Sequence, residues 1–212
     1  MLRRLALLCI SLSFSITTFA GELAAGAASQ RLNQSLTELQ SMHARFEQWV
    51  ADKSQTTLQH VTGTMWIQRP GQFRWDTDEP YPQQIVSDGK TLLIYDQDLE
   101  QATRKKLDNQ IGNTPALLLS GDPKQIDGSF TVSGYQFDET GELRFDLHPK
   151  DKEAMFSLLR VHFIQGYLRD MYLEDNLGQT TRIEFTQIKK NQPLASSVFE
   201  LKLDDAVDVI EE

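Results

Sequence analysis

Few residues in this chain have the types and spacing that metal binding or catalysis requires. The four histidines, His43, His60, His148 and His162, are scattered, and none has a second histidine or a cysteine at metal-ligand spacing. We therefore expect structural or surface roles for them and no metal site. Ser87-Asp88-Gly89-Lys90 matches the Ser-x-x-Lys signature of some serine hydrolases, but its accompanying motifs are missing and a turn explains the tetrapeptide.

The chain also lacks a phosphate-binding glycine loop and a Gly-x-Ser-x-Gly nucleophile motif. These observations predict no catalytic residue, no cofactor and no enzymatic activity. A hydrolase whose catalytic groups come together only in the folded protein is an alternative that the sequence leaves open.

The remaining feature is a group of aromatic side chains around one arginine. Trp66, Phe73 and Trp75 lie within ten residues of one another, and Arg69-Pro70 stands between them. Composition alone favours ordinary core for the three rings and a strand end at the surface for Arg69.

Period-two alternation predicts the strands that would position these residues. It runs through residues 42–46, and it resumes from Val61 to Ile67, with Trp66 on the opposite face from its apolar neighbours. Arg69-Pro70-Gly71 ends that strand, and Phe73 and Trp75 share one side of the next. Asp88-Gly89 between two strand-forming runs, residues 85–87 and 90–95, predicts a tight hairpin, and a further strand is expected over 99–107.

Two helices are expected. Leu32, Leu36 and Leu39 share one side of a helix over residues 22–41. Thr114 is a capping residue, Pro115 fits the first helical position and Gly121 ends a short helix. Because the body of this second helix is apolar, we expect it to be buried or to cover something apolar.

The second half of the chain is predicted to be a meander of antiparallel strands. The expected strands are Phe130–Asp138, Leu143–His148, Leu158–Ile164, Tyr167–Glu174 and Thr180–Ile188, separated by turn residues. Many antiparallel strands with few helices favour an α+β fold that is mostly antiparallel β. We expect a strongly curved sheet or open barrel with short helices on its concave side, forming a single domain over residues 21–212.

Residues 1–20 are typical of a cleavable signal peptide. Arg3 and Arg4 precede a short apolar run, and small residues end at Ala20, where we expect cleavage. A membrane anchor is the alternative, although the apolar run is short and rich in serine. Cys9, the only cysteine, lies in this segment, so the core must hold the exported chain together without a disulfide.

Cleavage would leave 19 basic and 30 acidic side chains, a net charge of about −11. Such a surface repels nucleic acid and anionic lipid headgroups, so we expect neither as a partner. A basic docking surface on another protein would be attracted to it.

Residues 63–121 resemble the periplasmic outer-membrane lipoprotein carriers, the LolA family. The resemblance is carried by several motifs in the same order, and weaker similarity covers most of the chain after residue 20. These motifs are Gly63 with Trp66, Arg69-Pro70, Phe73 with Trp75, Val86-Ser87-Asp88-Gly89-Lys90-Thr91-Leu92, Tyr95, Glu100-Gln101-Ala102-Thr103 and Gly112-Asn113-Thr114-Pro115. The C-terminus departs from the pattern, because Leu203-Asp204-Asp205-Ala206 stands where proline and glycine are common.

The resemblance implies an unclosed β-barrel, capped by helices over an apolar cavity, with Phe73 at the cavity mouth. It also implies that Arg69 acts as a latch by donating hydrogen bonds to the backbone carbonyls of Leu36, Leu119 and Ser120. The ligand-binding residues expected on this basis are Trp66, Phe73, Trp75, Leu93, Tyr95, Leu117 and Leu118.

The implied function is that of a monomeric periplasmic chaperone. It would accept triacylated lipoproteins from an inner-membrane ABC transporter and deliver them to an outer-membrane receptor. A second possibility is a periplasmic sensor of mislocalised lipoproteins with a similar half-barrel, although such sensors usually carry an additional C-terminal domain.

Overall fold

A computed structural model describes residues 21–24, 26–107, 115–137 and 140–212, except the side chains of 115–117. Within these residues the chain forms one sheet in the order β1-β8-β9-β10-β11-β12-β2-β3-β4-β5-β6-β7-β13. The strands of the first half are β1 (Gly21–Glu22), β2 (Ser41–Ala51), β3 (Thr57–Gln68), β4 (Gln72–Thr77), β5 (Gln83–Asp88), β6 (Thr91–Asp96) and β7 (Gln101–Lys106). Those of the second half are β8 (Phe130–Phe137), β9 (Glu142–Pro149), β10 (Phe156–Ile164), β11 (Tyr167–Asp175), β12 (Thr180–Lys190) and β13 (Asp208–Glu211).

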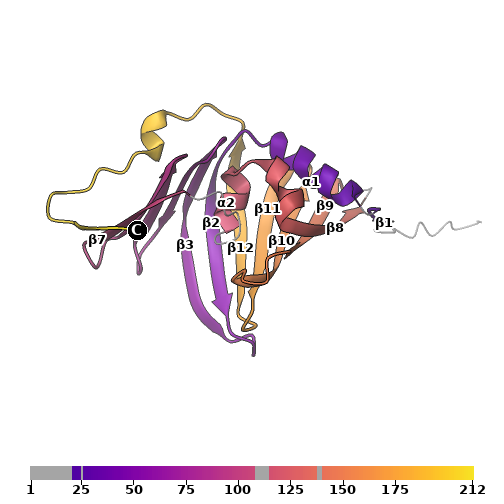
Figure 1. Cartoon of the computed structure of the whole chain (residues 1–212), viewed down its shortest axis with the longest axis horizontal. Helices are drawn as coiled ribbons and strands as arrows, with labels where there is room; N and C mark the ends of the chain where they lie inside the picture. Colours follow the sequence, from indigo (N-terminus) through magenta and orange to yellow (C-terminus); the bar gives the residue numbers. More distant parts are fainter. Residues whose placement is uncertain (1–20, 25, 108–114, 138–139) are drawn as a thin grey trace, which may run out of the picture.

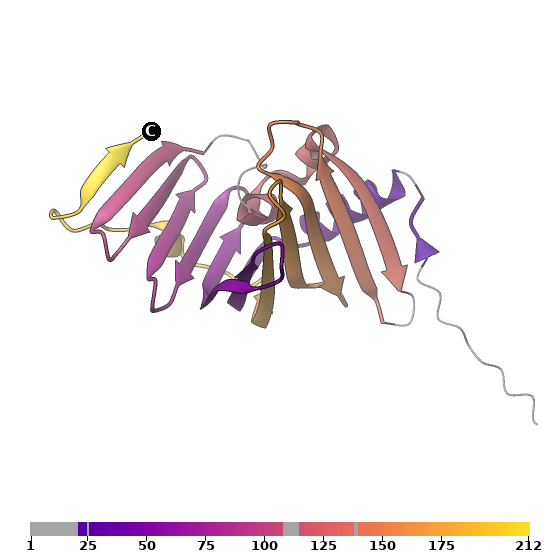
Figure 2. The ribbon, with the colours of Figure 1, turned by 90° about the horizontal axis from the view of Figure 1, so that it is seen from below.

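The sheet is strongly curved and does not close on itself (Figures 1 and 2). The described helices are α1 (Ala27–Thr37), α2 (Pro115–Ser120), α3 (Ile126–Ser129) and two short 3-10 turns, η1 (Pro123–Gln125) and η2 (Ser196–Phe199). Helices α1 and α2 lie on the hollow side of the sheet (Figure 1). The predicted fold class, a mostly antiparallel half-barrel with short helices on its concave face, is therefore confirmed.

One apolar core joins the helices to the concave face. Leu32 and Leu36 of α1 are fully buried with Met42, Phe46 and Phe185 of the central strands. At about 25 cal/mol per Å² of apolar surface, such burial is the main force that holds a disulfide-free sheet together. The concave face of β2, β3 and β12 is thus the base on which any site between sheet and helices is built.

Two glycines allow close approaches in the central sheet. A Cβ atom at Gly63 would overlap the Phe46 ring and the backbone carbonyl of Asp76, so only glycine lets that ring lie flat over β3. Gly89, with φ +94°, turns the chain between β5 and β6 and packs against Gly71 of the β3–β4 turn. The turns at this end of the sheet therefore lie against each other.

The expected elements were found, with different limits at the N-terminus. The structure places helix α1 at Ala27–Thr37, whereas we expected a helix over residues 22–41. Gly21 and Glu22 instead pair with β8, and Gly26 has a positive φ that a helix does not allow. Thr114, the expected cap of α2, lies outside the described residues.

The C-terminal segment was not anticipated. After β12 the chain runs along the outer side of the sheet, where Arg74 of β4 donates a hydrogen bond to the Val198 carbonyl (3.2 Å). Phe199 is buried there, and β13 then pairs in parallel with the edge strand β7 (Figure 2). The segment therefore covers an edge that would otherwise be open to pairing with another chain.

Candidate functional site

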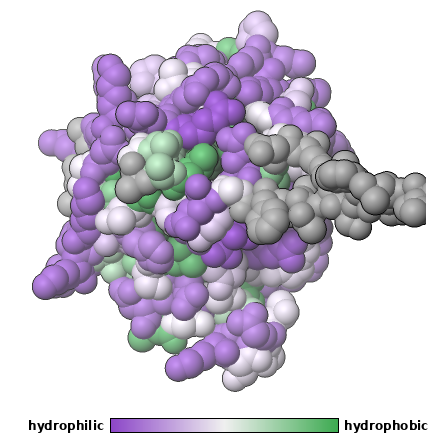
Figure 3. All heavy atoms as spheres, turned by 90° about the vertical axis from the view of Figure 1, so that its right-hand side faces the viewer, coloured by the Kyte–Doolittle hydropathy of each residue, from purple (hydrophilic) through white to green (hydrophobic). Residues whose placement is uncertain are grey.

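A cavity of about 650 Å³ lies between the concave face of the sheet and helix α2. Its volume is within the range typical of ligand-binding sites. Apolar side chains form much of its wall: Val61, Phe73, Trp75, Ile85, Leu119, Phe156, Met171, Leu173 and Ile183. On the face at the right-hand side of Figure 1, hydrophobic residues lie in small groups among mostly hydrophilic neighbours (Figure 3).

Aromatic packing shapes one wall of the cavity. The Trp75 ring stacks on Phe46 with centroids 3.8 Å apart, and Phe73 lies 6.2 Å from Trp75. Gly63 makes this stack possible, because it leaves room for the Phe46 ring beneath the indole. The structure thus places Phe73 and Trp75, two of the expected ligand-binding residues, side by side on the cavity wall.

The cavity has a closed end and an open end. At the closed end, Phe73 is 1% exposed and Leu119 of α2 is fully buried. At the other end, Tyr81, Leu99 and Met155 line the cavity while being 59%, 69% and 69% exposed. The expectation that Phe73 stands at the mouth is therefore wrong, because β4 enters the sheet beside α2 and the cavity opens at the opposite ends of the strands.

Arg69 joins both helices to the β3–β4 turn. Its side chain donates hydrogen bonds to the Leu39 carbonyl just after α1 (2.9 Å) and to the Gly121 carbonyl just after α2. Backbone amides add to this junction, from Arg69 to the Gln40 carbonyl (3.0 Å) and from Gly71 to the Ser120 carbonyl (2.9 Å). Carbonyls at helix ends are free acceptors for such bonds.

The acceptors differ from those that we expected for Arg69. The Leu36 carbonyl accepts from the Leu39 amide at the end of α1, and the Ser120 carbonyl accepts from Gly71. The guanidinium therefore bonds to the unpaired carbonyls that follow each helix, and no bond to the carbonyls of Leu36, Leu119 or Ser120 is found among the described residues.

Burial of the guanidinium lowers the pKa of Arg69 to about 10, against the opposing attraction of Asp122. The group therefore stays charged at neutral pH. Its Nη2 atom is buried with no hydrogen-bond partner within the part of the chain that the structure describes. A buried charge held only by main-chain carbonyls is costly unless those bonds are kept.

Three other expected ligand-binding residues lie on the outer face of the sheet. Trp66 pairs with Arg74, which faces the C-terminal segment, and its ring stacks on His43 at 5.1 Å. Leu93 and Tyr95 pair with Val86 and Gln84, whereas the alternate residues of β5 line the cavity. Successive residues of a strand face opposite sides, so these three side chains cannot share the cavity with Phe73 and Trp75.

Helix α2 contributes only in part as expected. Leu119 lines the cavity, whereas Leu118 is buried in the core beside it. The side chain of Leu117 lies outside the described residues.

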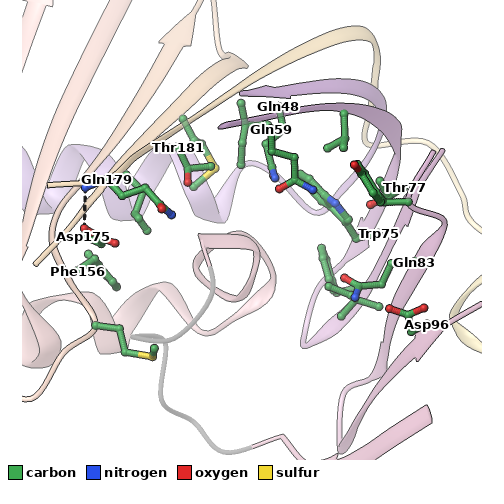
Figure 4. Close-up of a pocket in the computed structure, with 18 of the residues that line it drawn as sticks. Gln48, Gln59, Trp75, Thr77, Gln83, Asp96, Phe156, Asp175, Gln179 and Thr181 are labelled. Carbon is green, nitrogen blue, oxygen red and sulfur yellow. Dashed lines mark hydrogen bonds between the residues drawn. The ribbon is translucent and has the colours of Figure 1, made fainter. Parts of the chain in front are cut away.

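Sequence reasoning missed the polar side of the cavity. On seven adjacent strands, the last cavity-lining position before the open end is polar, and we name these residues the polar belt. The polar belt consists of Asp175, Thr181, Gln48, Gln59, Thr77, Gln83 and Asp96, in the order of the strands from β11 to β6. Figure 4 shows these side chains on the two facing walls of the cavity, together with Gln179. Continuing the period-two pattern to each strand end would have found them.

The described residues of the cavity wall include carboxylates and no cation. Asp98 lines it with Asp96 and Asp175, and no lysine, arginine or histidine does so among the described residues. No group of acidic, histidine or cysteine side chains in the described part of the chain is suited to hold a metal ion. None of the described helices is long and apolar enough to cross a membrane.

An open half-barrel with an apolar cavity under a helical lid is the architecture of a carrier of hydrophobic ligands. The sequence profile described as outer membrane lipoprotein carrier protein LolA matches residues 37–202, and the chain belongs to that family.

Curated relatives agree with this assignment over nearly the whole chain. A protein of Pseudomonas syringae pv. tomato, named outer-membrane lipoprotein carrier protein, is 43% identical over 206 residues, 97% of each chain. One of Pseudomonas putida with the same name is 44% identical over 203 residues, 95% of this chain and 93% of the relative.

Among solved structures, an uncharacterised conserved protein of Thermus thermophilus superposes with a TM-score of 0.53 at 10% identity. The match covers 86% of this chain and 96% of that one. At this identity the likeness supports the fold alone.

Proposed function

We propose that this protein is a periplasmic carrier that holds the acyl chains of lipoproteins and delivers them to an outer-membrane receptor. The observation that carries the proposal is the cavity of about 650 Å³ in a chain that belongs to the lipoprotein carrier family. The family is one of carriers, and we propose binding and transfer as the activity instead of catalysis.

The chemistry of the cavity suits this cargo. Each buried CH₂ group is stabilised by roughly 0.8 kcal/mol relative to water, so long acyl chains need an apolar enclosure during transit. Trp75, Ile85, Leu173 and Ile183 supply apolar contacts on two facing walls. Leu119 continues this surface toward the closed end, and Val61 lies between Trp75 and the polar belt.

The same proposal covers export and partners. Residues 1–20 would be a cleavable signal peptide, and residues 21–212 the carrier domain. An inner-membrane ABC transporter would load the lipoprotein and an outer-membrane receptor would accept it. The net charge of about −11 after cleavage favours basic docking surfaces on both partners.

We further propose that Arg69 is the latch of the empty state. Its bonds to the Leu39 and Gly121 carbonyls tie the ends of α1 and α2 to the β3–β4 turn. Entering acyl chains would displace α2 and break the Gly121 bond, and that bond would form again on release. The latch thus favours unloading.

Native mass spectrometry with a purified triacylated lipoprotein tests the carrier function. We expect a one-to-one complex that survives without detergent. Leu173→Glu places a charge on the cavity wall and should lower the complex yield by about tenfold, equivalent to about 1.4 kcal/mol. Thr186→Glu, on the exposed outer face of β12, is the matched control and should bind normally.

Far-UV circular dichroism and thermal unfolding would verify that both variants fold. No complex with the wild-type protein, or an unchanged complex with a folded Leu173→Glu variant, would contradict the proposal.

A further inference from the structure

The polar belt lies between the buried apolar part of the cavity and its open end, where Tyr81, Leu99 and Met155 are exposed. In β2 the inward-facing series changes from Phe46 to Gln48 toward the open end, and in β5 it changes from Ile85 to Gln83. Thr77, Gln83 and Asp96 are direct cross-strand neighbours, so the belt is continuous along this wall. A ligand whose chains fill the apolar end must place its head at the belt.

The belt has a distinct hydrogen-bonding character. Carboxamide and hydroxyl groups, as in Gln48, Gln83 and Thr77, donate and accept hydrogen bonds without carrying charge. They are matched to the ester and amide carbonyls that join acyl chains to the N-terminal residue of a lipoprotein. Such a head is uncharged at its linkages.

The polar belt is also negatively charged. Asp96 accepts a hydrogen bond from the Leu99 amide (3.2 Å), and Asp175 accepts from the amides of Leu177 and Gln179 (both 2.8 Å). These bonds fix negative charges at the belt on opposite walls, as Figure 4 shows. No lysine, arginine or histidine among the described lining residues balances them.

If a phospholipid bound in the cavity, its phosphate group would lie at the polar belt. Its acyl chains resemble those of a lipoprotein, so the apolar end of the cavity has no means to tell the two apart. Its phosphate would lie close to carboxylates in a partly desolvated site where no described lining residue is a cation, which is unfavourable. The discrimination must therefore come from the belt.

We infer that the polar belt selects cargo by the charge of its head, accepting uncharged ester and amide linkages and rejecting anionic phosphate headgroups. This inference rests on the proposed carrier function, and it explains how a carrier could act beside membranes made of phospholipid without being filled by it.

Binding of two soluble ligands that differ in one group tests the inference. Dioctanoylglycerol and dioctanoyl phosphatidylglycerol share their acyl chains, and a synthetic triacylated lipopeptide serves as the cargo. For the wild-type protein we expect the anionic lipid to bind at least about tenfold more weakly than dioctanoylglycerol, a difference of about 1.4 kcal/mol.

The double variant Gln83→Lys/Asp96→Asn raises the charge of one wall by two units and leaves Asp98 as its remaining carboxylate. Relative to dioctanoylglycerol, it should bind dioctanoyl phosphatidylglycerol about tenfold more tightly than the wild-type protein does. Thr131→Lys/Asp151→Asn changes the net charge equally at exposed positions outside the cavity and should leave both affinities unchanged.

The outcomes separate this inference from the carrier function. Equal binding of both lipids by the wild-type protein, or no change in the double variant, would overturn the charge selection even if the lipopeptide binds. Failure of the wild-type protein to bind the lipopeptide would instead overturn the carrier function.

Discussion

Replacing Arg69 with leucine should leave the fold intact but loosen the attachment of helix α2 to the β3–β4 turn. The change removes two side-chain hydrogen bonds from a charged donor, each worth about 1.5–3 kcal/mol. It also removes a buried charge. Burial lowers the pKa of Arg69 to about 10, and at about 1.4 kcal/mol per pKa unit this corresponds to a cost of roughly 3 kcal/mol.

The two effects largely offset each other. We expect the net loss of stability to be no more than about 3 kcal/mol, against the 5–15 kcal/mol typical of a domain. The loss acts locally, because the bonds tie α1 and α2 to the β3–β4 turn. The backbone amides at the end of α2 should therefore exchange with deuterium about 10- to 100-fold faster, whereas those of β2 and β3 should change little.

The effect of Arg69→Leu on lipoprotein transfer follows from the free energy of the lost latch bonds. The latch bonds stabilise the empty, closed protein, so their loss favours the loaded state. We expect Arg69→Leu to take up lipoprotein and to hand it on poorly in a two-component transfer assay. Arg182→Leu, which removes an exposed arginine from the outer face of β12, is the control. Normal transfer, or unchanged exchange at α2, would refute the latch.

Three further predictions concern packing and charge. Gly63→Ala should lower the unfolding free energy by about 1–3 kcal/mol, because the Phe46 ring must move, and wild-type thermal stability would contradict the placement of that ring. Phe73→Ala should cost about 3–5 kcal/mol by denaturant unfolding, since the side chain is 1% exposed, and a cost below about 1 kcal/mol would show that it is solvated. Asp78→Asn should cost about 0.2–1 kcal/mol at pH 7. Hydrogen bonds from Arg45 hold the pKa of Asp78 below its usual range, so its contribution is complete above the unfolded-state pKa and is lost as the pH falls through the lower folded-state pKa. A difference from wild type that persists at pH 2 would contradict that cause.

Alternation predicted most of the sheet because each strand is buried on one face. The strands of the second half lie within a few residues of their expected limits, and Phe73 and Trp75 share the cavity wall. The same alternation already separated Trp66 from its apolar neighbours. Assigning it to the cavity followed the resemblance and ignored the period of the strand.

Other features depend on the tertiary fold, and a local sequence pattern indicates them only in part or not at all. Arg69 bonds to carbonyls that no backbone amide already occupies. Which carbonyls these are depends on how both helices end, so the sequence alone does not predict them. Strand β13 is four residues long and is fixed by pairing with β7, without a strong apolar repeat of its own. The polar belt is spread over seven strands, and its residues become one surface only through the order of the sheet.

Tryptophan fluorescence tests the central claim, that acyl chains occupy the cavity, most directly. Trp75 lines the cavity, whereas Trp49 and Trp66 stack on histidines of the neighbouring strand. A Trp49→Phe/Trp66→Phe variant therefore reports from the cavity alone, and Trp49→Phe/Trp75→Phe reports from Trp66. A triacylated lipopeptide with brominated acyl chains, which quench only at contact, should quench the first variant and leave the second unchanged. Equal quenching of the two variants would contradict the account. So would the absence of quenching in a Trp49→Phe/Trp66→Phe variant that has bound the lipopeptide.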